Sequence, residues 1–289
     1  MKAPTEKIMR KISFVAEHEE TVLSLLLSNN VSKRLIRKLK QTNDGITING
    51  KHIRTIDKVF KGDRITITLD DEKTLESNGY LNVPVLFDCD DLIAFDKPYN
   101  MPVHPSIKHQ GDTLGNYFAH LCKGVSFRPI NRLDRDTSGI CVTAKNAFAA
   151  KSLQQTLEKT YYAIVCGKID SEGIIDAPIT RVDGSIITRE VSKHGQRAVT
   201  HYKPIKHSGN GKYTLLKIIL ETGRTHQIRV HFSYIGFPLA GDDLYGGDCS
   251  DIKRQALHCK SVRFLHPITG EEIKLDSELP PDMKKLMRK

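Results

Sequence analysis

The sequence predicts an α+β protein in which a small N-terminal unit of helices and strands precedes a large, mixed but mostly antiparallel sheet. Most segments from residue 160 onward have strand-like patterns, and few helical segments separate them, which is typical of antiparallel pairing. Residues 12–70 instead combine helical and strand-like segments within a short length. A polar stretch without periodicity, residues 71–84, is the expected linker, and residues 85–289 form the expected second domain.

The charge of the chain is concentrated near its N-terminus. The 289 residues include 44 Lys and Arg against 34 Asp and Glu, and six of the ten excess positive charges lie in residues 1–70. An excess confined to one small unit favours a polyanionic partner, most often nucleic acid. A protein that is merely basic is the alternative.

The composition also bears on location and redox state. The six cysteines are scattered without a C-x-x-C pair, which predicts reduced, buried thiols in a reducing compartment. There is no apolar run of the roughly 18–20 residues that span a bilayer, and no N-terminal signal pattern. We therefore expect a cytoplasmic protein that has no membrane partner. Phosphate-binding glycine loops and a serine-hydrolase elbow are also missing from the sequence.

Two helices dominate the N-terminal unit. After a strand at 12–15, a helix over 19–27 is expected to bury Val22, Leu23, Leu26 and Leu27. A second helix begins at Ser32, a good N-cap, and has an apolar stripe of Leu35, Ile36 and Leu39. The remaining positions of this helix are cations: Lys33, Arg34, Arg37, Lys38 and Lys40. A helix that exposes cations and no acid is suited to lie along a phosphate backbone.

A hairpin turn at Asn49-Gly50 and a strand at 65–69 follow these helices. The pattern of two helices, of which the second is basic, followed by G-x-x-x-N-G-K and a closing strand resembles the small S-four-type RNA-binding domain. The resemblance covers about 60 residues. It implies contacts with structured RNA through Lys33, Arg34, Arg37 and Lys38.

The second domain alternates strands with only two clear helices. A strand at 92–95 runs to Pro98, and Asp112 or Thr113 caps a helix that ends near Gly124. A strand at 140–143 and a helix near 146–158 follow. The later segments are expected to be strands: 160–166, 199–205, 213–221, 226–232, and a hairpin of 258–265 with 271–275.

The main candidate for chemistry is the loop from Arg132 to Gly139, in which Asp134 lies between Arg132 and Arg135. Opposite charges nearby favour the ionised carboxylate. Such a carboxylate can act as a nucleophile, as a general base or as a ligand for a positive group. A surface loop with ordinary ion pairs is the alternative.

Two further segments contain polar groups within strand-like patterns. In the first, alternation places Tyr161 and Tyr162 on opposite faces, so only one of them can face a site. In the second, an expected strand, alternation puts His226 and His231 on opposite faces, and no third ligand is evident, so a metal site is not supported. Its polar groups are costly to bury unless a phosphate or carboxylate pairs with them. The acids of the loop 240–247 can equally be capping groups.

Taken together, these segments resemble the RluA-type branch of the RNA pseudouridine synthases over residues 85–275. The matching motifs are Asp96-Lys97-Pro98, Val103-His104-Pro105, Arg132-Leu133-Asp134 with Thr137-Ser138-Gly139, Lys159-x-Tyr161-x-Ala163, Thr222 to His231, and Gly241-Asp242-x-Leu244-Tyr245-Gly246. The resemblance implies the pseudouridine synthase fold and the isomerisation of uridines in structured RNA without metal or organic cofactor. One departure is Asn131, at a position where the family commonly has histidine; asparagine can hydrogen-bond but cannot titrate.

The resemblance also implies roles for individual residues. Asp134 is the expected nucleophile, which attacks either the uracil ring or the ribose of a uridine flipped out of its stack. Tyr161 is expected to stack on the base and to help remove the proton at carbon 5. Arg229 is expected to pair with the aspartate. The expected RNA contacts around the pocket are Arg132, Asn131, Arg224 and His226.

Three alternatives remain open at this point. The protein could be a non-catalytic RNA-binding or ribosome-assembly protein on the same fold, although such a module has no need for Asp134, Tyr161 and Arg229 together. A glycosidic-bond hydrolase normally uses two acids, and the second acid is not apparent. The expected substrate is large-subunit ribosomal RNA, with transfer RNA as the other possibility, and the expected state is a monomer.

Overall fold

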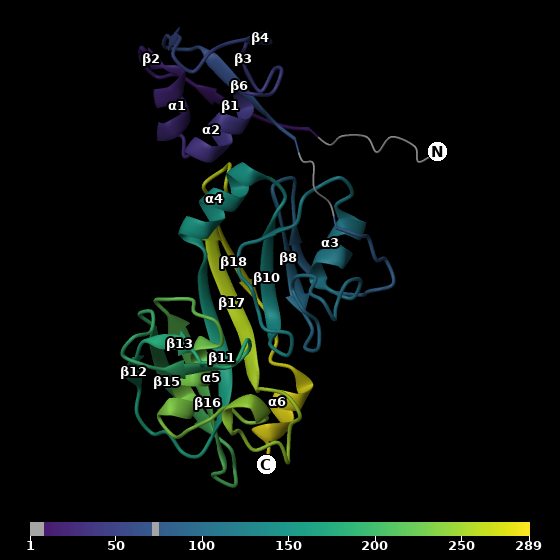
Figure 1. The fold of residues 1–289 in the computed structure, drawn as a ribbon, viewed down its shortest axis with the longest axis vertical. Helices are drawn as coiled ribbons and strands as arrows, with labels where there is room; N and C mark the ends of the chain where they lie inside the picture. Colours follow the sequence, from purple (N-terminus) through teal and green to yellow (C-terminus); the bar gives the residue numbers. More distant parts are fainter. Residues whose placement is uncertain (1–8, 71–74) are drawn as a thin grey trace.

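The computed structural model describes residues 9–70 and 75–289. A small N-terminal unit lies at one end of a long sheet, and the chain ends near the opposite end of that sheet (Figure 1). Residues 71–74 of the expected linker lie outside the described residues, and residues 75–84 form no helix or strand. The division into 12–70, 71–84 and 85–289 stays a prediction.

The N-terminal unit combines two helices with two small antiparallel sheets. One sheet has the order β1 (Arg10–Val15), β6 (Arg64–Leu69), β3 (Ile46–Ile48) and β4 (Lys51–His52). The other sheet pairs β2 (Glu20–Thr21) with β5 (Lys58–Val59). The helices are α1 (Val22–Ser28) and α2 (Lys33–Leu39).

Local signals in this unit predicted most of its structure. The Ser32 hydroxyl accepts a hydrogen bond from the Leu35 amide at 3.1 Å, which begins α2, and the apolar stripe of α2 is buried as expected. Asn49 and Gly50 both have positive φ angles, of 49° and 80°, so they form the expected tight turn between β3 and β4.

The first helix differs from its prediction in both start and face. It begins at Val22 because the Thr21 side chain accepts from the Ser24 amide and thereby caps the helix, while Glu20 and Thr21 pair with β5. The buried residues are Val22, Leu25 and Leu26, whereas Leu23 and Leu27 are 40% and 37% exposed. The helix therefore begins three residues later than predicted, and it buries Leu25 in place of Leu23 and Leu27.

The second part is built on a ten-stranded sheet. Its main path is β12 (Gly173–Asp176), β15 (Val199–His207), β16 (Tyr213–Leu220), β11 (Glu158–Cys166), β17 (Leu257–Leu265), β10 (Ser138–Ala144), β8 (Leu92–Lys97) and β7 (Val85–Asp88). β18 (Glu272–Asp276) pairs with β17, and β9 (Arg128–Pro129) pairs with β10. Among the described residues, the only parallel pairing in this sheet is between β10 and β17. The prediction of a mixed, mostly antiparallel sheet is confirmed.

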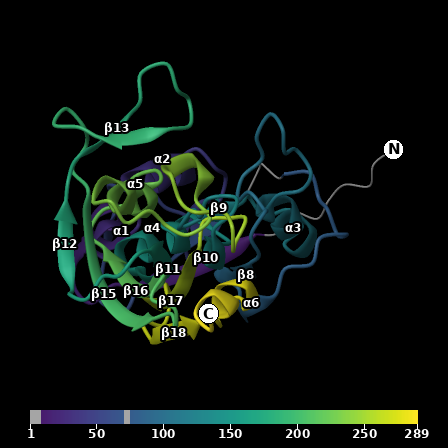
Figure 2. The ribbon, with the colours of Figure 1, turned by 90° about the horizontal axis from the view of Figure 1, so that it is seen from below.

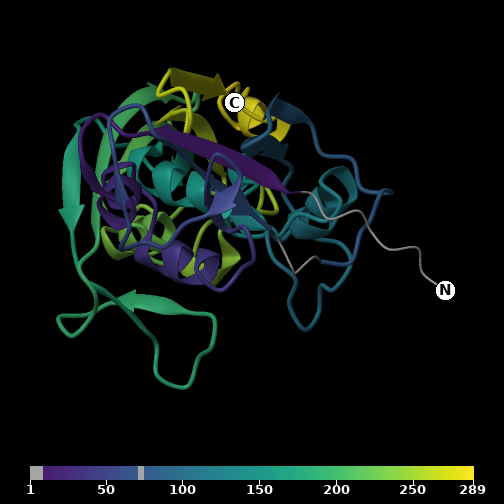
Figure 3. The ribbon, with the colours of Figure 1, turned by 90° about the horizontal axis from the view of Figure 1, so that it is seen from above.

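The helices of this part lie around the sheet (Figures 1 and 2). They are α3 (Leu114–Leu121), α4 (Ala147–Thr156), α5 (Gln227–Tyr234), the short η1 (Asp243–Tyr245) and α6 (Pro281–Leu286). Thr113 caps α3 as expected, and Asn146 caps α4. A hairpin of β13 (Ile179–Arg181) and β14 (Arg189–Val191) projects from the body (Figures 2 and 3).

The segment 226–232 is not the strand that its alternating pattern suggested. Residues Gln227–Tyr234 form α5, and six consecutive side chains of α5 are buried. The helix tolerates buried polar groups because each has a distant partner: Gln227 donates to the Val199 carbonyl, and His231 bonds Thr200 and the Ala177 carbonyl. His226 and Arg229 therefore lie three positions apart at one helix end, where both reach the same site.

The main hydrophobic core packs against the large sheet, and a separate cluster fills the N-terminal unit. Phe148 of α4 belongs to that second cluster, and its ring centroid is 5.8 Å from that of Phe14 on β1. Through this contact the N-terminal unit packs against α4 of the second part.

The cysteines are less uniformly buried than expected. Cys122, Cys141 and Cys259 are buried, and burial raises the pKa of the Cys141 and Cys259 thiols to about 12. Cys89, Cys166 and Cys249 are only half-buried. All six are free thiols in this structure. None of the helices in the described ranges has the length and apolar character needed to cross a membrane.

Candidate active site

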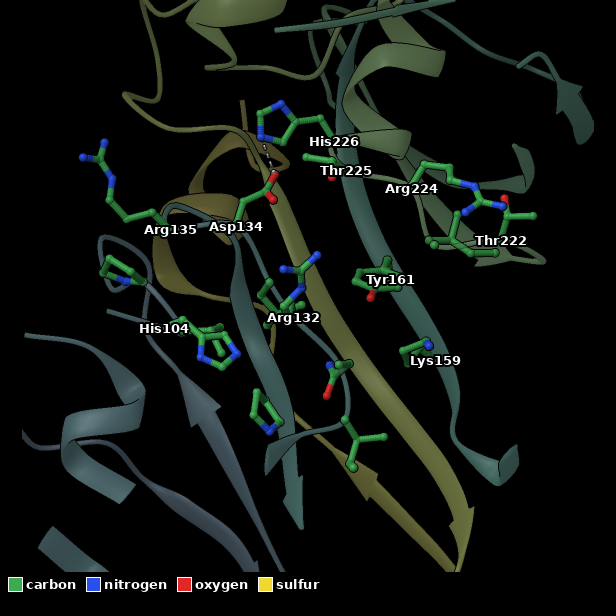
Figure 4. Close-up of a pocket in the computed structure, with 18 of the residues that line it drawn as sticks. His104, Arg132, Asp134, Arg135, Lys159, Tyr161, Thr222, Arg224, Thr225 and His226 are labelled. Atoms are coloured by element: carbon green, nitrogen blue, oxygen red, sulfur yellow. Dashed lines mark ion pairs between the residues drawn. The ribbon is translucent and has the colours of Figure 1, made fainter. Parts of the chain in front are cut away.

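A cleft of about 610 Å³ opens beside the loop that carries Asp134. Its walls come from segments far apart in the sequence: the turn near His104, the residues from Pro129 to Arg135, strand β11, and the connection from β16 to α5. Figure 4 shows Asp134 and His226 on one side of this space, with Arg132, Tyr161 and Lys159 around it.

The Asp134 carboxylate has one occupied and one free oxygen. Its Oδ2 accepts a hydrogen bond from Arg229 Nη1 at 3.1 Å, and His226 Nε2 lies 3.8 Å from the same oxygen. Within the described residues no donor contacts Oδ1, and the side chain is 29% exposed. Of its two neighbouring arginines, Arg135 binds Asp136 instead, at 2.9 Å. One carboxylate oxygen is therefore fixed while the other remains available to a ligand.

Arg229 is held by a second acid, Asp242. Arg229 Nε and Nη2 bind the two Asp242 oxygens at 2.7 and 2.8 Å, and its guanidinium lies 4.9 Å from the centre of the Tyr245 ring. Burial acts to lower the pKa of Arg229, but the bonds and charge of Asp242, together with the charge of Asp134, raise it above its ordinary value. The bidentate pair fixes the guanidinium so that its third nitrogen points at Asp134.

Asp242 is the functional residue that the sequence did not reveal. It belongs to a loop whose acids were interpreted as possible capping groups, yet it is almost fully buried. The turn before it requires glycine, because Gly241 has φ 75° and an added Cβ would lie 2.1 Å from the Arg254 carbonyl oxygen. A buried arginine needs an acidic partner, and that requirement was the signal available in the sequence.

Tyr161 forms the opposite wall of the cleft. It is buried in β11 and faces the main core and the cleft, whereas Tyr162 packs into a separate cluster with α6. The prediction that the two tyrosines face opposite sides is confirmed. A β-bulge against β17 lies between Thr160 and Tyr161, a feature that redirects side chains. Burial raises the pKa of Tyr161 well above its usual range, so its hydroxyl is protonated at neutral pH.

Comparison with known proteins agrees with this geometry. The model of the RNA pseudouridylate synthase family matches residues 91–234. The uncharacterised RNA pseudouridine synthase YjbO of Bacillus subtilis is 38% identical over 271 residues, which cover 89% of this chain and 95% of the relative. The ribosomal large subunit pseudouridine synthase D of Vibrio cholerae is 36% identical over 82% of this chain and 81% of its own length. The chain belongs to the RNA pseudouridine synthase family.

Solved structures show the same fold. The human RNA pseudouridylate synthase domain containing 1 superposes on this synthase with a TM-score of 0.60 at 24% identity, covering 74% of this chain and 91% of the human chain. The human RNA pseudouridylate synthase domain containing 4 gives a TM-score of 0.55 at 24% identity, covering 69% of this chain and 90% of the human chain. The fold implied by the sequence resemblance is confirmed.

His226 is tied into the site of this synthase through Tyr245. It adopts φ 58° at the start of α5, and its Nδ1 lies 2.8 Å from the Tyr245 hydroxyl. The Tyr245 hydroxyl accepts a hydrogen bond from the Arg189 backbone amide at 3.0 Å, so it can donate its own proton to His226 Nδ1. The proton of His226 is then on Nε2, the nitrogen that faces Asp134. Burial lowers the pKa of His226, and the charge of Arg229 acts in the same direction, against the charge of Asp134. Burial and Arg229 therefore favour the neutral imidazole.

Asn131 has a structural role in addition to the RNA contact predicted for it, which stays a prediction. Its side-chain amide donates to the Ile140 carbonyl at 2.9 Å and accepts from the Val142 amide at 2.8 Å. The preceding residue, Ile130, continues the β9–β10 pairing through its own amide. The Asn131 side chain thus takes the place of a peptide group and extends the β9–β10 hydrogen bonding toward the Asp134 loop. This role does not require a side chain that titrates.

Replacing Asn131 by leucine is expected to lower the free energy of unfolding by about 2–4 kcal/mol, because a buried donor and a buried acceptor each lose their partner. Urea denaturation measures the change. The matched control is Asn43→Leu at an exposed position, which should stay within about 0.5 kcal/mol of wild type. A loss below about 1 kcal/mol for Asn131→Leu would show that the ladder does not depend on this amide.

The remaining expected contacts are cations at two separate places. Arg132 and Arg224 are exposed and line the cleft, where Arg224 is fixed by a hydrogen bond to the Arg197 carbonyl. The N-terminal cations are exposed on α2, outside this cleft: Lys33, Arg34, Arg37 and Lys38. Of these, Lys38 is paired with Asp70 at 3.2 Å. Among the described residues, no three His, Cys, Asp or Glu side chains lie close enough together to hold a metal ion.

Proposed function

We propose that this synthase converts selected uridines of large-subunit ribosomal RNA to pseudouridine, with Asp134 as the nucleophile. The observation that carries the proposal is the Asp134 carboxylate at the cleft: the buried Arg229 binds its Oδ2, while no donor among residues 9–70 and 75–289 binds its Oδ1. The name of the Vibrio cholerae relative supports ribosomal RNA as the substrate. Transfer RNA is the second candidate.

The cleft suits a base that has left its stack. Flipping a nucleotide costs a few kcal/mol, which contacts to the extruded base must offset. Tyr161 offers a ring on which the uracil can stack. Arg132 and Arg224 at the edge of the cleft are placed to bind the phosphates on either side of the flipped nucleotide, and the cations of α2 extend this positive surface along structured RNA.

The reaction requires only rearrangement of bonds. Asp134 Oδ1 forms a bond to carbon 6 of uracil or to carbon 1 of the ribose, and the glycosidic bond from nitrogen 1 breaks. The detached base turns and carbon 5 bonds to carbon 1 of the ribose. The bond between Asp134 Oδ1 and the substrate carbon then breaks, which regenerates the free carboxylate, and the proton on carbon 5 is lost while nitrogen 1 gains one. Atoms and charge balance without an outside reactant. Arg229 holds the Asp134 carboxylate in the attacking geometry, and its positive charge stabilises the negative charge that returns to this carboxylate when the bond to Oδ1 breaks.

Tyr161 is proposed to take part in removing the proton at carbon 5. Its hydroxyl is protonated at rest, so it passes its own proton on as it accepts the one from carbon 5. Tyr161→Phe keeps the stacking ring and removes only the hydroxyl. Release of tritium from RNA labelled at carbon 5 of uridine is expected to fall about 10²–10⁴-fold, the usual range for general acid–base groups. RNA affinity should stay within about threefold; an unchanged release rate would remove the hydroxyl from the mechanism.

Mapping pseudouridines after deletion of the gene tests the substrate. Loss at positions of large-subunit ribosomal RNA, restored by the wild-type gene, is the expected result. Loss confined to transfer RNA would replace the ribosomal assignment. An unchanged pseudouridine map would favour the non-catalytic RNA-binding alternative, which the purified protein and RNA carrying 5-fluorouridine can test separately, because only a catalytic protein should convert or trap the modified base.

A further inference from the structure

Three buried side chains hold the loop that carries Asp134, at three consecutive residues. Lys97 Nζ donates to the Arg135 carbonyl at 3.1 Å, and Arg254 Nη1 donates to the Asp136 carbonyl at 3.2 Å. Gln255 Nε2 donates to Thr137 Oγ1 at 3.3 Å. None of these three side chains lines the cleft, so they hold the loop from outside the substrate space.

Lys97 joins this loop to the end of β8. Its side chain is fully buried, and its ammonium also donates to the Pro98 and Met101 carbonyls, both at 2.8 Å. All three of its protons therefore have a carbonyl acceptor. The Met101 amide adds a second tie by donating to the Arg135 carbonyl at 3.0 Å. Burial lowers the pKa of Lys97 to about 8, and the three carbonyl dipoles hold its charged form.

Arg254 joins the same loop to the C-terminal helix. Its Nε and Nη2 bind both oxygens of Asp282 on α6, at 2.7 and 3.0 Å, and its guanidinium lies 4.8 Å from the centre of the Tyr99 ring. The nitrogen that reaches Asp136 also donates to the Leu257 carbonyl on β17. The bidentate pair fixes the guanidinium plane, and with it the nitrogen that holds the loop.

We propose that Lys97 and Arg254 are positioning residues that fix the backbone of residues 135–136 and thereby the direction in which Asp134 presents Oδ1. The proposal rests on the proposed role of Asp134. Buried ion pairs often add little to the free energy of unfolding, because well-packed apolar side chains of similar size can give equal or greater stability. Their value here is geometric: both end on carbonyls of the loop itself, and a nucleophile displaced by about 1 Å can lose about 100-fold in rate.

Methionine variants at the two positions test this proposal. Lys97→Met and Arg254→Met are expected to lower kcat for tritium release about 100-fold, with KM and RNA affinity within about threefold of wild type. The substrate is ribosomal RNA labelled at carbon 5 of uridine, prepared from cells that lack the gene. Arg254→Lys, which retains a donor for the Asp136 carbonyl, should recover about tenfold over Arg254→Met. The control is Arg263→Met, an exposed arginine of β17 that pairs with Glu158.

Hydrogen exchange provides a readout that does not depend on activity. The amides of residues 134–137 are expected to exchange about tenfold faster in both methionine variants, while the other sheet amides keep their rates. The proposal is overturned if the folded variants lose less than about threefold in kcat, if the loss appears in KM, or if it only follows the unfolded fraction.

Two further outcomes are decisive. If a methionine variant does not fold, Asp282→Asn weakens the grip on Arg254 from outside the loop, and it should still lower kcat by about tenfold; an unchanged kcat would overturn the proposal. If wild type releases no tritium from the labelled RNA, the proposed function fails. Faster exchange at residues 134–137 in the variants would then still support the positioning role, whereas unchanged exchange would overturn it.

Discussion

Replacing Arg229 by methionine is expected to reduce uridine isomerisation about 100–1000-fold and to lower the free energy of unfolding by about 3–5 kcal/mol. The stability loss follows from Asp242, which is almost fully buried and would lose the guanidinium that binds both of its oxygens. The activity loss follows from Asp134, whose Oδ2 loses the donor that orients it. Urea denaturation and tritium release measure the two effects on the same protein.

A double variant separates these two effects. Arg229→Met with Asp242→Leu removes both charges of this buried pair, so most of the lost stability should return, because replacing both partners of a buried pair is often neutral. The isomerisation rate should stay low, since Asp134 still lacks its donor. The exposed Arg263→Met is the control for loss of an arginine. If the double variant is as unstable as the sum of the single ones, the coupling between Arg229 and Asp242 is absent.

The parts of the fold that local chemistry determines could be predicted from the sequence. Ser32 caps α2 through an amide three residues away, and Asn49-Gly50 turns a hairpin within its own four residues. The strands of the large sheet also have readable patterns, because one or both of their faces are buried along most of their length. These features need no knowledge of distant segments.

The α5 segment shows where local reasoning fails. Alternation of polar and apolar residues suggested a strand, but the buried side chains of Gln227 and His231 on α5 bond to partners 28 to 54 residues away in the sequence. Burial of both polar and apolar positions removes the periodicity that identifies a surface helix. A strand would also place His226 and Arg229 on opposite faces, whereas in the structure both lie beside Asp134.

The site itself was predicted only in part. The pairing of Arg229 with Asp134, 95 residues apart, followed from resemblance to a family and not from spacing. Asp242 and Lys97 were visible only as members of motifs, because their roles depend on which carbonyls and guanidinium the fold brings beside them. The structural role of Asn131 was not predicted, because its backbone partners on β10 could not be known from the sequence.

Asp134→Asn tests the central claim most directly, because it keeps the size and shape of the side chain and removes its charge and nucleophilicity. The asparagine oxygen can still accept from Arg229, so RNA affinity should stay within about threefold of wild type. The rate of pseudouridine formation is expected to fall by about 10⁴-fold or more. The other described acid that lines the cleft, Glu221, is paired with Arg197 and His201.

The measurement is single-turnover tritium release from ribosomal RNA labelled at carbon 5 of uridine, taken from cells that lack the gene, with a pseudouridine map of the product. Asp170→Asn, at an exposed carboxylate paired with Lys168, is the control and should match wild type. A release rate for Asp134→Asn below about 10⁻⁴ of wild type, with RNA still bound, is the predicted result. A variant that forms pseudouridine within about tenfold of the wild-type rate would contradict the assignment of Asp134 as the nucleophile.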